Sequence, residues 1–122
     1  MCKLVKKKIE RYENLLGEML VATEKYLGAF SVKLLVERVV WDLSAEYREI
    51  ELLQYDEGRI SCAEIAASIK KNPDLPVDDM FMKFIIRYVE ILAKLIGYEK
   101  TEKITKKLDE EFEDISLRLR EE

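Results

Sequence analysis

The stretch VDDMFMKFIIRYVEILAKLI, residues 77–96, decides the fold of this chain. Its polar side chains after the first turn follow one another at steps of four, three and four residues, and they are Lys83, Arg87, Glu90 and Lys94. On a helix these positions form one narrow polar stripe, and nearly every other position is apolar. A helix of this kind is buried on most of its sides. We therefore predict that residues 77–96 form a helix at the centre of a bundle.

Two helices are predicted before this segment. Residues 3–27 carry one stripe at alternating steps of four and three, formed by Val5, Ile9, Tyr12, Leu16, Met19, Thr23 and Tyr26. A second helix should run from residue 30 or 31 to residue 47, with its main apolar face at Val32, Val36, Val39, Val40, Leu43 and Tyr47. Gly28 lies between the two helices and is a natural residue to end the first one.

A short helix and a final long helix complete the prediction. The pattern Ser61-Cys62-Ala63-Glu64 is a capping box, which predicts a helix from Ser61 to about residue 71. Gly97 ends the helix over 77–96, and another helix should follow over about 99–120. That last helix has only a thin apolar stripe, typical of a coiled-coil seam or an edge helix, at Ile104, Leu108, Phe112, Ile115 and Leu119.

The fold class that follows is all-α. Only residues 48–61 lack a helical period, and a turn signal, Asp56-Glu57-Gly58, interrupts them. We predict a single helical domain over residues 1–122, an antiparallel bundle of four long helices and one short helix. The second and fourth helices should lie at its centre, and an irregular or short extended segment should occur near residues 48–60.

Composition excludes several kinds of active site. The chain contains no histidine, so Ser-His and Cys-His nucleophile pairs and histidine-ligated iron sites are excluded. Cys2 and Cys62 have no metal-ligand spacing, and we expect Cys62 to pack as a small hydrophobe. The net charge of −4 argues against nucleic-acid binding. We expect no enzyme activity, no catalytic residues, no cofactor and no metal.

The expected setting of the protein rests on weaker signals. No apolar run is long enough to span a membrane, and the N-terminus lacks the apolar core of a signal peptide, so we expect a cytoplasmic protein without membrane contact. Lysine and glutamate are plentiful whereas glutamine and asparagine are scarce, which indicates a thermophilic source.

The sequence leaves two functional hypotheses open, a small-molecule sensor and a nucleotide hydrolase, beside the protein association that is predicted below. Met19, Met80, Met82, Tyr12, Tyr26, Tyr88 and Phe84 could line an apolar pocket between helices in a small-molecule sensor. More remotely, glutamate pairs three residues apart could hold Mg²⁺ in a nucleotide hydrolase, and these pairs are Glu10 and Glu13, Glu46 and Glu49, Glu99 and Glu102, and Glu110 and Glu113. Each pair lies beside lysine or arginine, which favours a solvated face of ion pairs.

The most specific signal for function is a second apolar stripe on the predicted helix over 30–47. Leu34, Trp41 and Ala45 project together on the side opposite the valine-rich face, with Arg38 beside them. Tryptophan is enriched in interface hot spots surrounded by polar residues. We therefore predict a non-catalytic regulatory or adaptor module that works as a homo-oligomer or by binding another protein. The alternative is that residues 48–61 or another helix of the same chain cover this stripe.

Overall fold

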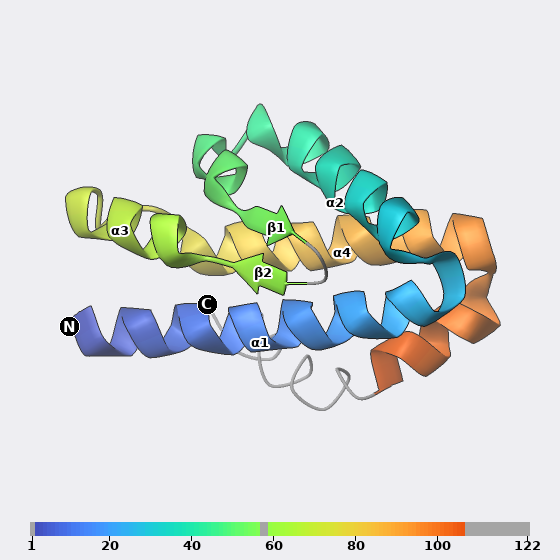
Figure 1. Cartoon of the computed structure of the whole chain (residues 1–122). Coiled ribbons are helices and arrows are strands. Elements are labelled where there is room, and N and C mark those ends of the chain that lie inside the picture. The colour runs from blue at the N-terminus through green and yellow to red at the C-terminus, as the bar shows by residue number, and fades with distance from the viewer. Residues whose placement is uncertain (1, 57–58, 107–122) are drawn as a thin grey trace.

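The computed structural model describes residues 2–56 and 59–106 and has the predicted all-α fold (Figure 1). Its elements, in chain order, are α1 (Cys2–Leu27), α2 (Ala29–Ser44), the 3₁₀ helix η1 (Arg48–Leu52), β1 (Gln54–Asp56), β2 (Arg59–Ser61), α3 (Ala63–Lys71) and α4 (Val77–Ile96). Residues 98–106 form a further helical segment. The apolar stripe predicted for that helix lies mostly outside the described residues; of its members, Ile104 is buried.

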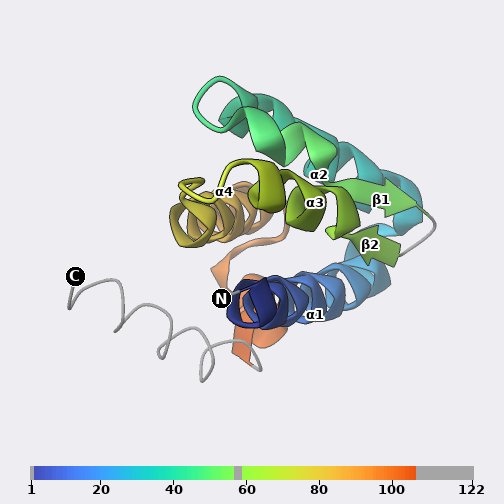
Figure 2. The same ribbon diagram turned by 90° about the vertical axis from the view of Figure 1, so that its left-hand side faces the viewer.

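The helix α4 lies in the middle of the molecule, between α1 and α2 (Figure 2). Its fully buried side chains form one broad face, and they include Met80, Phe81, Phe84, Ile85, Tyr88 and Leu92, whereas Ile86 and Leu95 are exposed. Tyr12 of α1 stacks on Phe81, with ring centroids 4.6 Å apart. α2 packs against α1, α4 and η1, and its buried residues also share one face, so α2 and α4 are the two central helices that the sequence predicts.

A buried hydrogen-bond chain explains the polar residue within the apolar stripe of α1. The Tyr88 hydroxyl donates to Thr23 Oγ1 over 2.8 Å, and Thr23 Oγ1 donates to the Met19 carbonyl oxygen over 2.8 Å. Burial raises the pKa of the Tyr88 phenol. Both buried hydroxyls therefore have acceptors, and the chain links α4 to α1 in one orientation.

The segment without helical period folds into η1 and a two-stranded hairpin. β1 and β2 pair antiparallel, with Gln54 opposite Ser61 and Asp56 opposite Arg59. The hairpin lies across the gap between α1 and α2 (Figure 1), and buried Ile50 and Leu53 attach this segment to the core. The predicted short extended stretch is thus confirmed, and the 3₁₀ helix before it is an addition.

The predicted capping box at α3 is wrong in its detail. The helix begins at Ala63, and its N-cap residue is Cys62, whose side chain forms no capping bond. Instead, the Cys62 amide donates to Glu13 Oε2 of α1 over 2.7 Å. A carboxylate from another helix therefore accepts a hydrogen bond at the start of α3 and lies favourably at the positive end of its dipole.

Two glycines form sharp corners with nearly the same backbone geometry. Gly28 has φ 83° and ψ 163°, and Gly97 has φ 88° and ψ 160°. Each glycine amide closes the helix before it, and each glycine carbonyl accepts the first hydrogen bond of the next helix, from Val32 and Thr101. This backbone region is almost restricted to glycine, so one residue suffices to turn the chain between the two helices at each of these corners.

We expect Gly28→Ala and Gly97→Ala each to lower the free energy of unfolding by about 1–3 kcal/mol, because a Cβ is strained at these dihedrals although space is open around it. Gly17→Ala is the matched control. Gly17 lies within α1, where an added Cβ would make an ordinary contact 3.8 Å from Ile60, and alanine should stabilise the helix by about 1 kcal/mol. Urea unfolding followed by circular dichroism measures the stability of all three variants. Equal effects at the three glycines would contradict the claim that Gly28 and Gly97 occupy a backbone conformation that only glycine tolerates.

Candidate association surface

The predicted second apolar stripe of α2 lies on the outside of the molecule. Trp41 is 75% exposed and Leu34 is 49% exposed. Ala45, which caps the end of α2, is exposed too. The opposite face of the helix is buried and comprises Val32, Leu35, Val36, Val39 and Leu43. Of the other residues predicted for this face, Val40 is partly buried, and Tyr47 is buried but lies after the end of α2 at Ser44.

Phe30 belongs to the same exposed stripe, and the sequence analysis missed it. Its side chain is 74% exposed. Because α2 begins at Ala29, Phe30 lies one helical turn before Leu34 and on the same side. The spacing of four, seven and four residues between positions 30, 34, 41 and 45 indicates that these residues share one helix face. Phe30 was left out because the predicted helix began at residue 30 or 31, which placed Phe30 at or before its first residue. We call Phe30, Leu34, Trp41 and Ala45 the α2 stripe.

The chain flanks Trp41 without covering it. A groove of about 280 Å³ lies between α2 and the segment that contains η1 and β1, and it is lined by Lys33, Val36, Glu37, Val40, Trp41, Ser44, Glu51, Leu53 and Tyr55. This segment covers the valines beside the stripe, yet three quarters of the indole surface stays exposed. The alternative of an intramolecular cover by residues 48–61 is therefore wrong for the described parts of that segment.

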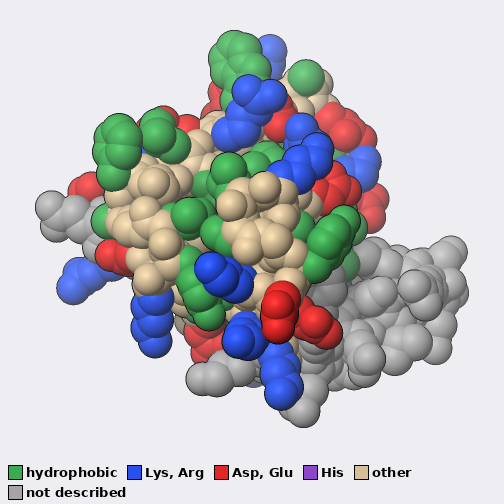
Figure 3. Space-filling model, turned by 90° about the vertical axis from the view of Figure 1, so that its right-hand side faces the viewer, with side chains coloured by type: hydrophobic (Ala, Val, Ile, Leu, Met, Phe, Trp, Pro, Cys, Tyr) green, Lys and Arg blue, Asp and Glu red, His purple; other side chains and the backbone are tan. Residues whose placement is uncertain are grey.

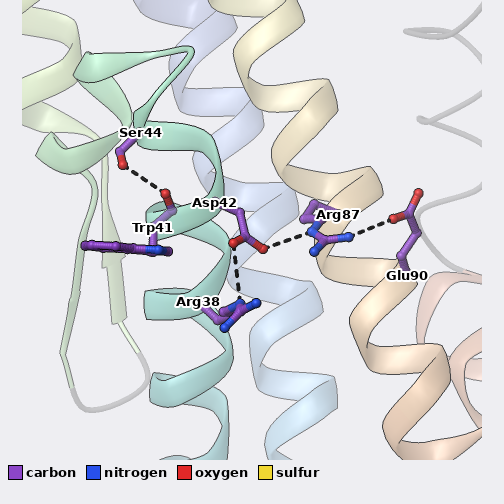
Figure 4. A network of polar contacts seen from close by, with 6 residues as sticks. All are labelled: Arg38, Trp41, Asp42, Ser44, Arg87 and Glu90. Carbon is purple, nitrogen blue, oxygen red and sulfur yellow. Dashed lines mark hydrogen bonds and ion pairs between the residues drawn. The ribbon is translucent and has the colours of Figure 1, made fainter.

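On its other side, α2 is attached to α4 by a chain of charged side chains (Figure 4). Arg38 Nε lies 3.4 Å from Asp42 Oδ1, and Arg87 Nε of α4 donates to Asp42 Oδ2 over 3.0 Å. Asp42 is partly buried between the two guanidinium groups, and its hydrogen bond is the main cause that raises the pKa of Arg87. Trp41 points away from this network (Figure 4).

A second cross-link strengthens the same attachment. Lys83 of α4 donates to Glu46 and lies 5.2 Å from the centroid of the Tyr47 ring. These contacts use two members of the polar stripe that the sequence predicts for α4, Lys83 and Arg87. They lie at the edge of the contact between α2 and α4, and the burial of the valine-rich face of α2 directs the α2 stripe outward.

Other exposed hydrophobic side chains are more scattered. Figure 3 shows the end of the molecule where α1 meets α2 and α4 meets residues 98–106, and there hydrophobic patches alternate with charged side chains. The large ones outside α2 are Val21, Tyr26, Ile86, Leu95 and Tyr98. These five residues do not include two aromatic side chains aligned on one helix face, as Phe30 and Trp41 are on α2.

The residues of the sensor hypothesis do not surround one cavity. Tyr12, Met80, Met82, Phe84 and Tyr88 are packed in the core. Met19 and Tyr26 line an open groove of about 780 Å³ that is bounded by α1, β2 and residues 103–104. This groove is a surface feature with charged residues such as Glu18, Lys25 and Arg59 along it.

The carboxylates are spread over the surface. Within the described ranges, no three side chains of cysteine, aspartate or glutamate come close enough to hold a metal ion. Glu13 accepts the bond from Cys62, and Glu46 pairs with Lys83. Glu110 and Glu113 lie outside the described residues.

Comparisons with protein-family models, with curated proteins and with solved structures gave no match. Among the described helices, none combines the length and the apolar character that crossing a membrane requires.

Cys62 is a fully buried thiol, as predicted, and we expect it to be unreactive in the folded protein. Burial, with a smaller contribution from the Glu13 carboxylate, raises its pKa to about 12, so almost no thiolate forms near neutral pH. In a Cys2→Ser background, Ellman's reagent should label no thiol in buffer and one thiol in denaturing urea. Labelling of the folded protein at the rate of a free thiol would contradict this prediction.

Proposed function

We propose that this protein is a non-catalytic helical module that works by association, as a homodimer or with a protein partner, in a regulatory or adaptor role. The observation that carries the proposal is the α2 stripe, on which two aromatic side chains, each about three quarters exposed, align with Leu34. A single exposed apolar side chain is ordinary, whereas an aligned set rimmed by polar residues is typical of an interface.

The rim of the stripe supports this proposal. Lys33 and Glu37 border it on the side of the groove, and Arg38 borders it on the side of α4. Interfaces combine an apolar centre with a polar rim that excludes water, and tryptophan is the residue most enriched among their energetic hot spots. No structural feature comparable to the α2 stripe supports either of the two alternatives, the sensor and the Mg²⁺-dependent hydrolase, so we do not propose them. Cytoplasmic location and thermophilic origin stay predictions from composition.

We expect Trp41→Ala to weaken association by about 2 kcal/mol or more, while helical content and melting of the monomer change little, because the indole packs against little of its own chain. Sedimentation over a range of concentrations measures the association. The mass of the parent protein should approach twice 14.4 kDa for a homodimer, or the mass of the complex when a partner protein is present.

Tyr98→Ala is the matched control, since Tyr98 is an exposed aromatic residue on a different helix. It should leave the mass unchanged. A Trp41→Ala protein that assembles like the parent, or that melts at a much lower temperature without a change in assembly, would overturn the role of the α2 stripe.

A further inference from the structure

The two aromatic residues of the α2 stripe place a twofold centre midway between them, at residues 35–36. Phe30 and Trp41 are its two large aromatic residues, and they lie eleven positions apart, which is about 16 Å along a helix. Leu34 lies between them, close to the midpoint at residues 35–36. Phe30 and Trp41 also resemble each other in exposure, so neither end of the stripe has a cover that the other lacks.

A second copy of α2, packed antiparallel around a twofold axis at that midpoint, brings the three large residues of the stripe, Phe30, Leu34 and Trp41, against those of the first copy. In this register Phe30 of each copy lies opposite Trp41 of the other. The two Leu34 side chains flank the axis, about 4.5 Å apart along the direction of the helices. Aromatic pairs of this kind contribute beyond the area that they bury. The axis therefore brings every large apolar residue of the stripe against another one.

The charges beside the stripe fit the same register. Lys33 and Glu37 are both exposed, both line the groove edge of α2, and neither forms an ion pair with another described residue. A twofold axis places the groove edges of the two copies against each other. Lys33 of one copy then lies within about one residue, or 1.5 Å along the helix, of Glu37 of the other. Two symmetric ion pairs result.

The opposite edge of the stripe tolerates this arrangement. Arg38 is the charged residue there, and the two copies of Arg38 would lie about 7.5 Å apart along the direction of the helices. Each Arg38 is already paired with Asp42 of its own chain. The repulsion between the two guanidinium groups is therefore largely offset within each copy.

The groove beside Trp41 supplies room for the aromatic contact. Its volume of about 280 Å³ is at the lower limit of ligand pockets but suits a side chain. Val40, Leu53 and Tyr55 contribute apolar surface next to the indole. In the antiparallel register Phe30 of the second copy lies at the level of Trp41, on the side of this groove.

We infer that the partner bound by the α2 stripe is a second copy of this chain, in an isologous dimer whose two α2 helices pack antiparallel, with Phe30 against Trp41 and Lys33 against Glu37. This inference rests on the proposed association through α2 and adds the partner and the register. A partner of another sequence would need a matching stripe, whereas a twofold interface uses one self-complementary surface. One helix pair with its rim is a small interface, so association in the micromolar range is expected.

The test is a charge-reversal cycle measured by sedimentation equilibrium at low salt. Lys33→Glu and Glu37→Lys should each raise the dissociation constant of the dimer at least tenfold, because each places like charges opposite one another twice. The double variant Lys33→Glu/Glu37→Lys should return to within about threefold of the parent. Both single effects should shrink in high salt, because ions screen exposed charges.

The matched control is the pair Glu102→Lys and Lys106→Glu, exposed residues at the same spacing on another helix, which should leave dimerisation unchanged. A parent dimer in which the single reversals have no effect, or in which the double variant fails to recover, would overturn this register while leaving association through α2 intact. A parent that stays monomeric at hundreds of micromolar would overturn the second copy as the partner. The proposed function would then be tested on a complex with a different protein, which Trp41→Ala should weaken.

Discussion

The rest of the structure depends on the burial of α4. This helix is apolar around most of its circumference, so it is stable in water only when other elements cover it on several sides. α1 supplies one cover through Tyr12 and Thr23, which contact Phe81 and Tyr88. α2 supplies another through its valine-rich face, whose burial sets its rotation, and the Asp42–Arg87 and Glu46–Lys83 pairs lie at the edge of that contact. The exposure of Trp41 is a consequence of that rotation.

Much of this arrangement could be predicted from local sequence patterns. Helical spacing located α1, α2 and α4 to within a few residues, because apolar periodicity reports which face of a helix is buried. The corners at Gly28 and Gly97 were predictable because the backbone there suits almost no other residue. The exposed position of Leu34 and Trp41 followed from their placement opposite a valine-rich face.

The features that the sequence could not supply depend on contacts between distant residues. The bond from the Cys62 amide to Glu13 spans 49 positions, and the local pattern around Ser61 does not indicate it. The 3₁₀ helix at residues 48–52 forms where Ile50 must reach the core, which no periodicity marks. Phe30 was missed for a smaller reason, since its membership in the α2 stripe depends on where α2 begins.

Association through α2 is best tested through Trp41, because it is the only tryptophan of the chain. Its fluorescence therefore reports on this one site without any labelling or mutation. The measurement is acrylamide quenching at a series of protein concentrations, with sedimentation of the same samples. If the α2 stripe is the interface, quenching should be strong in the monomer and fall, with a blue shift of the emission, in step with assembly. An assembly whose tryptophan stays as quenchable as that of the monomer would place the interface elsewhere and contradict the account.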